Sequence, residues 1–428
     1  MIAMTRKPAS FAPAIGLLLM LAGCTNSHFD PPQVAGRPAM VDDAGKPRLW
    51  VLTKQEEQKQ VSVGGSRRSS GSWRTDTFFH FDLRAFDPET ARPLWKQRLL
   101  TLGDHEAHGS SPSRVIGSNT EGYLLGQDGD LVWMMLDTDP WAVSAADGKP
   151  VANGAGLEQR NPELKGLLPS EAKFYGFDKG LVVTTADARQ FVIRGPDLKA
   201  VAYAPSVAAK PPPELKSNGS ERIVPLRLSI GDVPARLVEL EGRRIGLYSA
   251  PEARDAASDQ FGDHLRYPYS ILKEGAQVRR SFWNANVVPT TRFDETYDRF
   301  TDFTPIEGAP SFLNGRFVKV PGTDNALLQQ QPAGVLVWHD TRIDSDGVLA
   351  VTRLDAKLKT LWTTELPISQ TNLSPAVSYW PLPGRLLVLG ARQTVEDGAT
   401  NWETHVVALA LNDGAKQVWN LQRDQAVP

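Results

Sequence analysis

The chain of 428 residues contains a single cysteine, Cys24. One cysteine forms no internal disulfide, builds no cysteine-rich metal site and leaves no second thiol to act as a nucleophile. The chain also lacks a dense run of lysine and arginine, and its net charge is -2 at pH 7. Because an electrostatic footprint for DNA or RNA is missing, we exclude nucleic acid as a partner.

Long amphipathic helix patterns are missing as well. The sequence is instead rich in turn residues, with 35 glycines and 32 prolines. Short segments of apolar and β-branched residues lie between these turns, which is typical of strands. The clearest are residues 48–52, 123–125, 131–135, 180–184, 236–240, 335–338 and 385–390. The sequence therefore predicts an all-β fold.

A short pattern recurs along the chain: an alternating strand, a turn carrying Asp or Asn, and then a Trp. The clearest copies are residues 79–95, 349–362 and 406–419, with looser copies at residues 141–149 and 191–199. Period-two alternation in the first copy predicts that one face carries Phe79, Phe81, Leu83 and Ala85 and the other carries His80, Asp82 and Arg84. We expect each copy to be a β-hairpin.

The spacing of the copies indicates a larger repeat. Asp87 to Asp147 is 60 residues, Asp147 to Asp197 is 50, and Asp355 to Asn412 is 57. Four strands with their turns fit that length, and repeated four-stranded units are typical of β-propellers. We expect a propeller of six to eight blades over residues 48–428.

The first residues have the order of an export signal. Arg6 and Lys7 precede an apolar run at residues 14–21, which is too short for an ordinary transmembrane helix. Residues 1–23 are therefore expected to be a cleaved signal peptide. Leu21-Ala22-Gly23-Cys24 resembles the lipobox of bacterial lipoproteins, which implies acyl chains such as palmitate on Cys24. The alternative is a buried free cysteine that follows a leader by chance.

A lipid anchor at this position predicts an address in the bacterial cell envelope. By resemblance to enterobacterial sorting, Thr25 in place of Asp favours the periplasmic face of the outer membrane over the inner membrane. Residues 24–47 contain several prolines and glycines with little periodicity, so we expect a flexible tether between the lipid and the folded body.

The repeats also resemble a known family. Ala85-Phe86-Asp87 with Trp95, Leu354-Asp355 with Trp362, and Ala410-Leu411-Asn412 with Trp419 are similar to the quinoprotein-type, or PQQ-like, propeller repeat. Together with Cys24, they resemble propeller lipoproteins of the outer-membrane-protein assembly type. The resemblance implies the fold, whereas function does not follow from a fold alone. The Trp residues are expected to pack between blades.

Two insertions interrupt the repeats. Residues 205–220 contain three consecutive prolines and predict an exposed loop. Residues 255–310 are rich in arginine and aromatic side chains, the types that dominate contact energy at interfaces. The candidate partner-binding residues here are Arg266, Tyr267, Tyr269, Arg279, Arg280 and Trp283. The alternative is a long loop whose aromatics cover a small core of their own.

No motif predicts catalysis, and we expect neither a cofactor nor a metal. His105 and His108 have the wrong spacing for a zinc-protease helix. Asp340, Asp344 and Asp346 form only part of a calcium loop, and Asp346-Gly347 is a hairpin turn signal. The glycine-serine stretch at residues 64–72 is expected to be a hairpin tip rather than a phosphate loop.

The sequence thus favours an envelope lipoprotein whose propeller binds or scaffolds an envelope protein. The alternative is a quinone- or metal-dependent enzyme, or a small-ligand receptor, with its site in the propeller channel. Quinone-dependent dehydrogenases of this repeat class commonly carry an adjacent cysteine pair, which this chain lacks.

Overall fold

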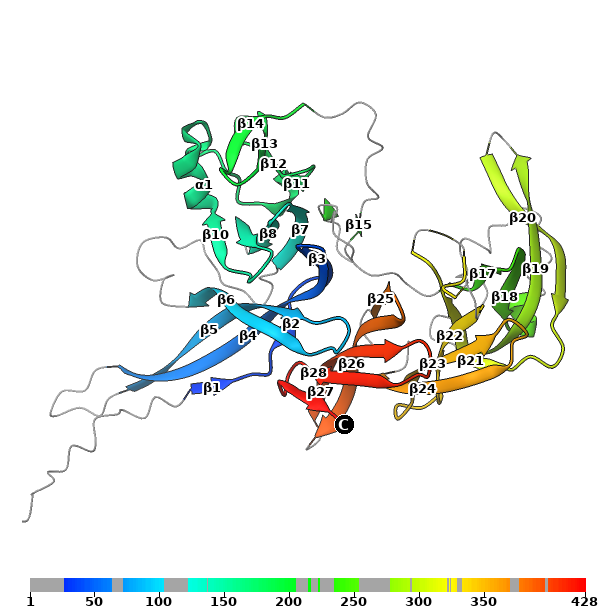
Figure 1. Cartoon of the computed structure of the whole chain (residues 1–428). Coiled ribbons are helices and arrows are strands. Elements are labelled where there is room, and N and C mark those ends of the chain that lie inside the picture. The colour runs from blue at the N-terminus through cyan, green and yellow to red at the C-terminus, as the bar shows by residue number, and fades with distance from the viewer. Residues whose placement is uncertain are drawn as a thin grey trace, which may run out of the picture.

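The computed structural model describes residues 27–63, 72–103, 122–136, 138–204, 215–216, 222–223, 235–253, 278–292, 295–321, 323, 325–328, 333–369, 377–396 and 399–428. The described part is dominated by antiparallel sheets, which confirms the all-β prediction (Figure 1). Its longest helix, α1 (Gly154–Arg160), has seven residues. Among the described residues, no helix is long and apolar enough to cross a membrane.

The first three sheets follow the chain in order. The first contains β3 (Ala39–Asp43), β4 (Lys46–Val63), β5 (Ser72–Phe86) and β6 (Pro93–Gly103), with β1 (Ser27–Phe29) and β2 (Gln33–Val34) also paired to β4. The second contains β7 (Gly122–Asp128), β8 (Leu131–Leu136), β9 (Asp139–Ser144) and β10 (Pro150–Asn153). After α1, η2 (Pro162–Leu164) and η3 (Ala172–Phe174), the third contains β11 (Tyr175–Phe177), β12 (Leu181–Thr184), β13 (Gln190–Arg194) and β14 (Lys199–Ala202).

The later sheets are larger. A two-stranded ribbon, β15 (Leu215–Lys216) and β16 (Arg222–Ile223), precedes them. The next sheet contains β17 (Leu237–Leu240), β18 (Arg243–Tyr248), β19 (Arg279–Arg292), β20 (Glu295–Pro305), β21 (Phe312–Val318), β22 (Gly334–Asp340), β23 (Val348–Asp355) and β24 (Thr360–Ser369). The last contains β25 (Ser378–Leu382), β26 (Arg385–Glu396), β27 (Ala399–Ala410), β28 (Lys416–Asn420) and β29 (Gln425–Val427).

The eight-stranded sheet consists of two four-stranded halves. The halves β17–β20 and β21–β24 are joined through β19 and β21, where only Arg279 pairs with Leu313 and Arg280 with Phe312. Within each half, successive strands pair over longer stretches. The described chain therefore contains six antiparallel units, each with four strands that pair in chain order; β1 and β2 add to the first unit and β29 to the last.

The hairpins predicted from the recurring pattern are confirmed. The strand pairs are β5 with β6, β9 with β10, β13 with β14, β23 with β24, and β27 with β28. The Trp residues lie on the second strand of their hairpins, where Trp95 pairs with Ala85, Trp362 with Arg353 and Trp419 with Val406.

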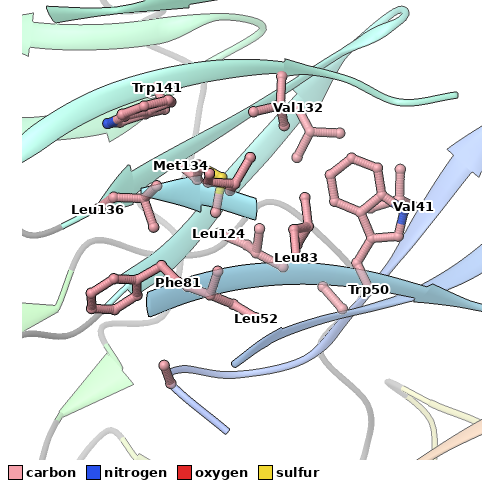
Figure 2. Close-up of a cluster of buried hydrophobic side chains, with 14 of the residues drawn as sticks. Val41, Trp50, Leu52, Phe81, Leu83, Leu124, Val132, Met134, Leu136 and Trp141 are labelled. Atoms are coloured by element: carbon pink, nitrogen blue, oxygen red, sulfur yellow. The ribbon is translucent and has the colours of Figure 1, made fainter. Parts of the chain in front are cut away.

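The two faces predicted for β5 are also confirmed, but both are covered. The apolar residues of the first face belong to the core between the first and second sheets, which Figure 2 shows in close-up. The polar residues His80, Asp82 and Arg84 are also buried. Arg84 donates to the carbonyl of Leu421 in the last sheet, at 3.4 Å. A polar face of a strand is thus buried when a second sheet packs against it.

The boundary of the folded body differs from the sequence expectation. Within the expected tether at residues 24–47, β3 pairs along β4 from Ala39 with Trp50 to Asp43 with Lys46. Ala39 and Val41 are buried in the first core. This correction has a local cause, because Ala44 and Gly45 take positive φ and form a tight hairpin turn. Proline and glycine there mark turns within the sheet rather than a free linker.

The insertions also differ from expectation where they are described. Much of the second, residues 255–310, contributes β19 and β20 to a sheet, and the two strands pair from Trp283 with Pro305 to Arg292 with Glu295. Most of residues 205–220 lies outside the described part, although β15 falls within it. The glycine-serine stretch lies between the paired ends of β4 and β5, Val63 and Ser72, and residues 64–71 are outside the described part.

Five buried clusters connect the six units in a series. They lie between β17–β20 and β21–β24, between β21–β24 and β25–β29, between β25–β29 and β3–β6, between β3–β6 and β7–β10, and between β7–β10 and β11–β14. Figure 1 shows the units following one another along an arc. The described sheets do not establish a closed ring or a blade number.

Candidate functional site

Half of the residues predicted to bind a partner fall within the described chain. Arg279, Arg280 and Trp283 lie on β19. Arg266, Tyr267 and Tyr269 lie outside the described residues, as do Cys24 and the histidines 105 and 108.

Arg280 is buried rather than presented to a partner. Its guanidinium is 3% exposed and contacts the carboxylate of Glu252, with Nη2 2.9 Å from Oε1. Arg236 contacts the same oxygen at 3.0 Å. Burial by itself raises the pKa of Glu252, but the hydrogen bonds and charge of Arg280, the N–H of Ser249 and the charge of Arg236 together hold that pKa below its usual range. This correction removes Arg280 from the exposed surface that the sequence predicts, because a buried charge is retained where it is paired.

Trp283 is also committed to contacts within its own sheet. Its ring stacks on Phe303 with centroids 5.1 Å apart, and its Nε1 donates to the carbonyl of Tyr248 at 3.1 Å. Arg279 is exposed and donates to the carbonyl of Ser311 at 2.9 Å. The described aromatic side chains of residues 255–310 therefore pack within their own sheet. This agrees with the alternative interpretation, in which the aromatics of the insertion cover a small core of their own.

A polar cavity of about 770 Å³ lies where β24 faces β26, β27 and β28. It continues the apolar core between these two units. Val388 and Val418 come before Arg392 and Asn420, and Val407 comes after His405, on the same face of their strands. The polar residues that line it include Ser369, Arg392, Glu403, His405, Asn420 and Arg423. The turn between β22 and β23 and residues 425–428 form its rim.

A hydrogen-bond network organises the floor of this cavity. Asn420 donates from Nδ2 to Glu403 Oε2 at 2.9 Å and to His405 Nε2 at 3.3 Å. The second contact assigns the proton of neutral His405 to Nδ1. Arg423 donates from Nε to Glu403 Oε1 at 2.7 Å, and its backbone N–H donates to Asn420 Oδ1 at 2.9 Å. The network fixes four side chains from β27, β28 and the following turn.

His405 is the least satisfied member of the network. It is 3% exposed, and among the described residues its Nδ1 has no hydrogen-bond partner of good geometry. Burial lowers the pKa of His405 to about 4; nearby Arg392 and Arg423 act in the same direction, and Glu403 opposes them. The imidazole is therefore neutral near pH 7.

The charged residues that line the cavity are Arg392 and Arg423 with Glu403 and Asp346, and Arg392 is the side chain through which an anionic group could bind. Arg392 is exposed at the cavity wall, while Arg423 is held by Glu403. A carboxylate or phosphate beside Arg392 would attract its guanidinium through paired N–H donors. The same anion would raise the pKa of His405, because an opposite charge favours the imidazolium.

A second set of hydrogen-bonded polar side chains links β4, β5 and β6. His80 lies 2.8 Å from Glu57 Oε2 through Nε2 and 3.0 Å from Thr101 Oγ1 through Nδ1. Burial raises the pKa of Glu57, but the contact with His80, the hydrogen bond from Ser27 and the charge of Lys59 together lower it. Phe29 stacks on the ring of His80 at 6.1 Å. We interpret this set as a cross-strand contact that fixes β1 and β6 to the long hairpin.

Metal ligands do not gather in the described part of the chain, where no group of three or more His, Cys, Asp or Glu side chains is found. Asp340 accepts from Asn314 Nδ2 at 2.7 Å, and Asp344 is paired with Arg342. The Asp346-Gly347 turn connects β22 to β23, which confirms the hairpin prediction.

The sequence did not identify the residues of the cavity. Arg392, Glu403 and Asn420 come from three strands, and their alignment follows only from the register of the last sheet. A weak signal was available, since the apolar alternation of β26, β27 and β28 changes to polar residues toward one end.

Comparison of the chain with models of known protein families and with curated proteins gave no match. The structure defines a class by its fold: an all-β protein of successive antiparallel units, each with four strands that pair in chain order, with a polar cavity between two of the units.

Proposed function

We propose that this protein is a lipid-anchored binding module of the bacterial cell envelope, and that its body is a β-propeller. The propeller is supported by one observation above all, a turn that recurs in five of the six units. In each of these turns, one or two residues before the second strand of the hairpin, a residue takes positive φ: Ala91 (55°), Gly148 (69°), Leu198 (53°), Leu358 (61°) and Gly414 (75°).

This turn lies against the preceding unit of the series. A Cβ at Gly148 would lie 2.5 Å from the ring of Trp95, and one at Gly414 would lie 2.8 Å from Trp362. Trp95 Nε1 also donates to the carbonyl of Ala146, at 3.0 Å. Such head-to-tail packing of like units is typical of a propeller, whose blades repeat around an axis.

The other three turns follow the same rule. Leu198, Leu358 and Ala91 are buried in the clusters that connect their own unit to the one before it. Six units in one direction fit the six to eight blades expected from the sequence.

A closed ring is tested by electron cryomicroscopy of the mature protein: closure requires contact between β11–β14 and β17–β20, and an open arc would contradict it.

The membrane anchor rests on Cys24 and its lipobox. Replacement of Cys24 by Ser should abolish incorporation of labelled palmitate and release the protein from the membrane fraction. Unlabelled wild-type protein would contradict the anchor.

For partner binding we propose the end of the β26–β27 hairpin beside the cavity. It presents Val395, which is 70% exposed, and Trp402, which is 38% exposed. These two residues lie diagonally opposite on one face, because Gln393 pairs with Trp402 and Val395 with Thr400. Exposed aromatic and aliphatic side chains at the end of a rigid hairpin are suited to a protein partner.

A photo-crosslinking amino acid introduced at position 395 or 402 tests this assignment in cells. We expect both positions to crosslink to the same envelope protein. The matched control is position 201 on β14, where Val201 is 43% exposed. Equal crosslinking at all three positions, or none at 395 and 402, would argue against the hairpin end as a binding surface.

A second candidate function is reception of a small anionic ligand in the cavity. It is favoured by Arg392 beside the neutral His405. Titration with a series of small mono- and dicarboxylates, followed by the NMR signals of His405, distinguishes the two functions. A ligand-dependent rise in the pKa of His405 that is lost in Arg392→Gln supports reception.

A further inference from the structure

The start of β1 lies beside the outer half of the long β4–β5 hairpin. β1 runs antiparallel to β4, with Ser27 opposite Lys59 and Phe29 opposite Glu57. Along β4, the direction from Glu57 to Lys59 leads toward the hairpin end at Val63. Ser27 is therefore the end of β1 that lies nearer the hairpin end.

Cys24 lies only three residues before Ser27. Three residues span at most about 10 Å, even when fully extended. Three residues of β4 also separate Lys59 from Ser62, so a lipid on Cys24 lies within reach of the outer end of the hairpin. A short connection of this kind restricts which part of the body approaches the bilayer.

The hairpin end presents a large exposed aromatic side chain. Trp73 pairs with Ser62 and is 67% exposed. Phe29, on the adjacent β1, is 49% exposed. Figure 1 shows this part of β4 and β5 extending away from the other sheets, with β1 alongside it. Tryptophan is enriched at the headgroup level of membranes, where its amphipathic ring is favoured.

The described residues near Trp73 carry charges of both signs. Arg74 Nε donates to Asp76 Oδ1 at 2.8 Å, and Asp76 is buried. The nearby strand pair carries Lys59 and Glu57 as well. Arg67 and Arg68 also lie between the two strands in the sequence, so we expect anionic lipid to strengthen the contact that the indole makes with a bilayer.

We propose that the outer end of the β4–β5 hairpin lies against the membrane that holds the anchor, with Trp73 in the headgroup region. The partner of this surface is a lipid bilayer. This inference rests on the proposed lipid anchor, because the anchor sets the distance between the hairpin and the membrane. Contact would orient the body by fixing a second point besides Cys24.

The test uses cysteine labelling of full-length lipidated protein in vesicles. Cys24 is the only cysteine and its sulfur carries lipid, so an introduced cysteine is the one free thiol. Thr75→Cys places an environment-sensitive fluorophore two residues from Trp73 on the same face of an exposed strand end. The control Ile343→Cys labels a side chain that is 67% exposed, in the turn between β22 and β23.

Vesicles of phosphatidylethanolamine and phosphatidylglycerol with brominated acyl chains then report lipid contact. We expect the label at position 75 to be quenched several-fold more than the label at position 343, and more strongly at low salt than at high salt. The additional change Trp73→Ser should reduce this quenching, whereas Trp73→Phe should retain part of it.

The outcomes separate the two proposals. Lipidated protein whose two labels are quenched equally would overturn the hairpin contact and leave the anchor standing. Protection of position 75 from water without lipid quenching would indicate a protein neighbour and would also overturn it. A mature protein with a free Cys24 thiol would overturn both.

Discussion

At the scale of single residues, the ionisable side chains between sheets determine how this protein responds to pH. His405 has a folded-state pKa of about 4, whereas a histidine in an unfolded chain has one of about 6.5. Above about pH 6.5 neither state binds the proton. As pH falls from about 6.5 toward 4, the unfolded state binds it first, so the free energy of unfolding decreases.

We therefore expect His405→Gln to flatten the stability profile between pH 6.5 and 4, by on the order of 2–3 kcal/mol at the acidic end. Urea denaturation at a series of pH values measures this. His28→Gln, at a side chain that is 74% exposed, is the matched control. A wild-type slope that persists unchanged in His405→Gln would show that other groups cause it.

The buried contacts of Glu252 give a second prediction. Glu252→Gln leaves Arg280 and Arg236 without their counter-charge, and breaking a buried pair in this way typically costs about 3–5 kcal/mol. Chemical denaturation measures the loss. Asp344→Asn removes an ion pair with Arg342 on an exposed turn and should cause no measurable change. Similar effects of the two variants would contradict a structural role for the buried pair.

At the scale of elements, the recurring turn is constrained by its positive φ and by its contact with the neighbouring unit. Two substitutions test these constraints separately. Gly414 has φ of +75°, and an added Cβ would approach Trp362 to 2.8 Å. Gly308 has the same φ and nothing within 4 Å of an added Cβ. An alanine at positive φ costs about 1–2 kcal/mol through its backbone alone.

Gly308→Ala is thus expected to lower the free energy of unfolding by about 1–2 kcal/mol. Gly414→Ala should lower it further, because the new methyl group also displaces an indole at a close contact between units. Equal losses in the two variants would mean that packing of Trp362 against the turn is not a constraint.

At the scale of the whole molecule, the last sheet is packed between the first sheet and β21–β24. Neighbouring residues of β25 face opposite units: Tyr379 belongs to the cluster with β21–β24, and Trp380 to the cluster with β3–β6. Both are at most 2% exposed. Truncation of a buried aromatic residue typically costs about 3–5 kcal/mol.

This arrangement predicts opposite patterns of hydrogen exchange. Trp380→Ala should increase amide exchange in β4 and β5, more than 290 residues away in the sequence, with less effect on β22 and β23. Tyr379→Ala should do the reverse. Exchange measured by mass spectrometry decides between this behaviour and uniform loosening, which would argue against packing in series.

Local patterns were readable from the sequence because their causes are local. Alternation placed Phe81 and Leu83 on one face of a strand, and turn residues around Asp87, Asp355 and Asn412 marked hairpins that the structure confirms. Each of these signals acts between residues that are close in the chain. The expected lipid attachment at Cys24 also depends on a short segment and stays a prediction.

Tertiary structure decided what depends on contacts between distant segments. Arg280 was expected at a binding surface, yet Glu252 and Arg236 surround it because β19 pairs with β18 and β21. The segment that forms β3 was expected to be part of a flexible tether, yet it pairs with β4 on the edge of that strand opposite β5. The cavity around His405 forms because β26, β27 and β28 change from apolar to polar residues at positions that pair with one another across the sheet. Strands and turns could be predicted from local backbone preference, whereas register and sheet packing set which side chains meet.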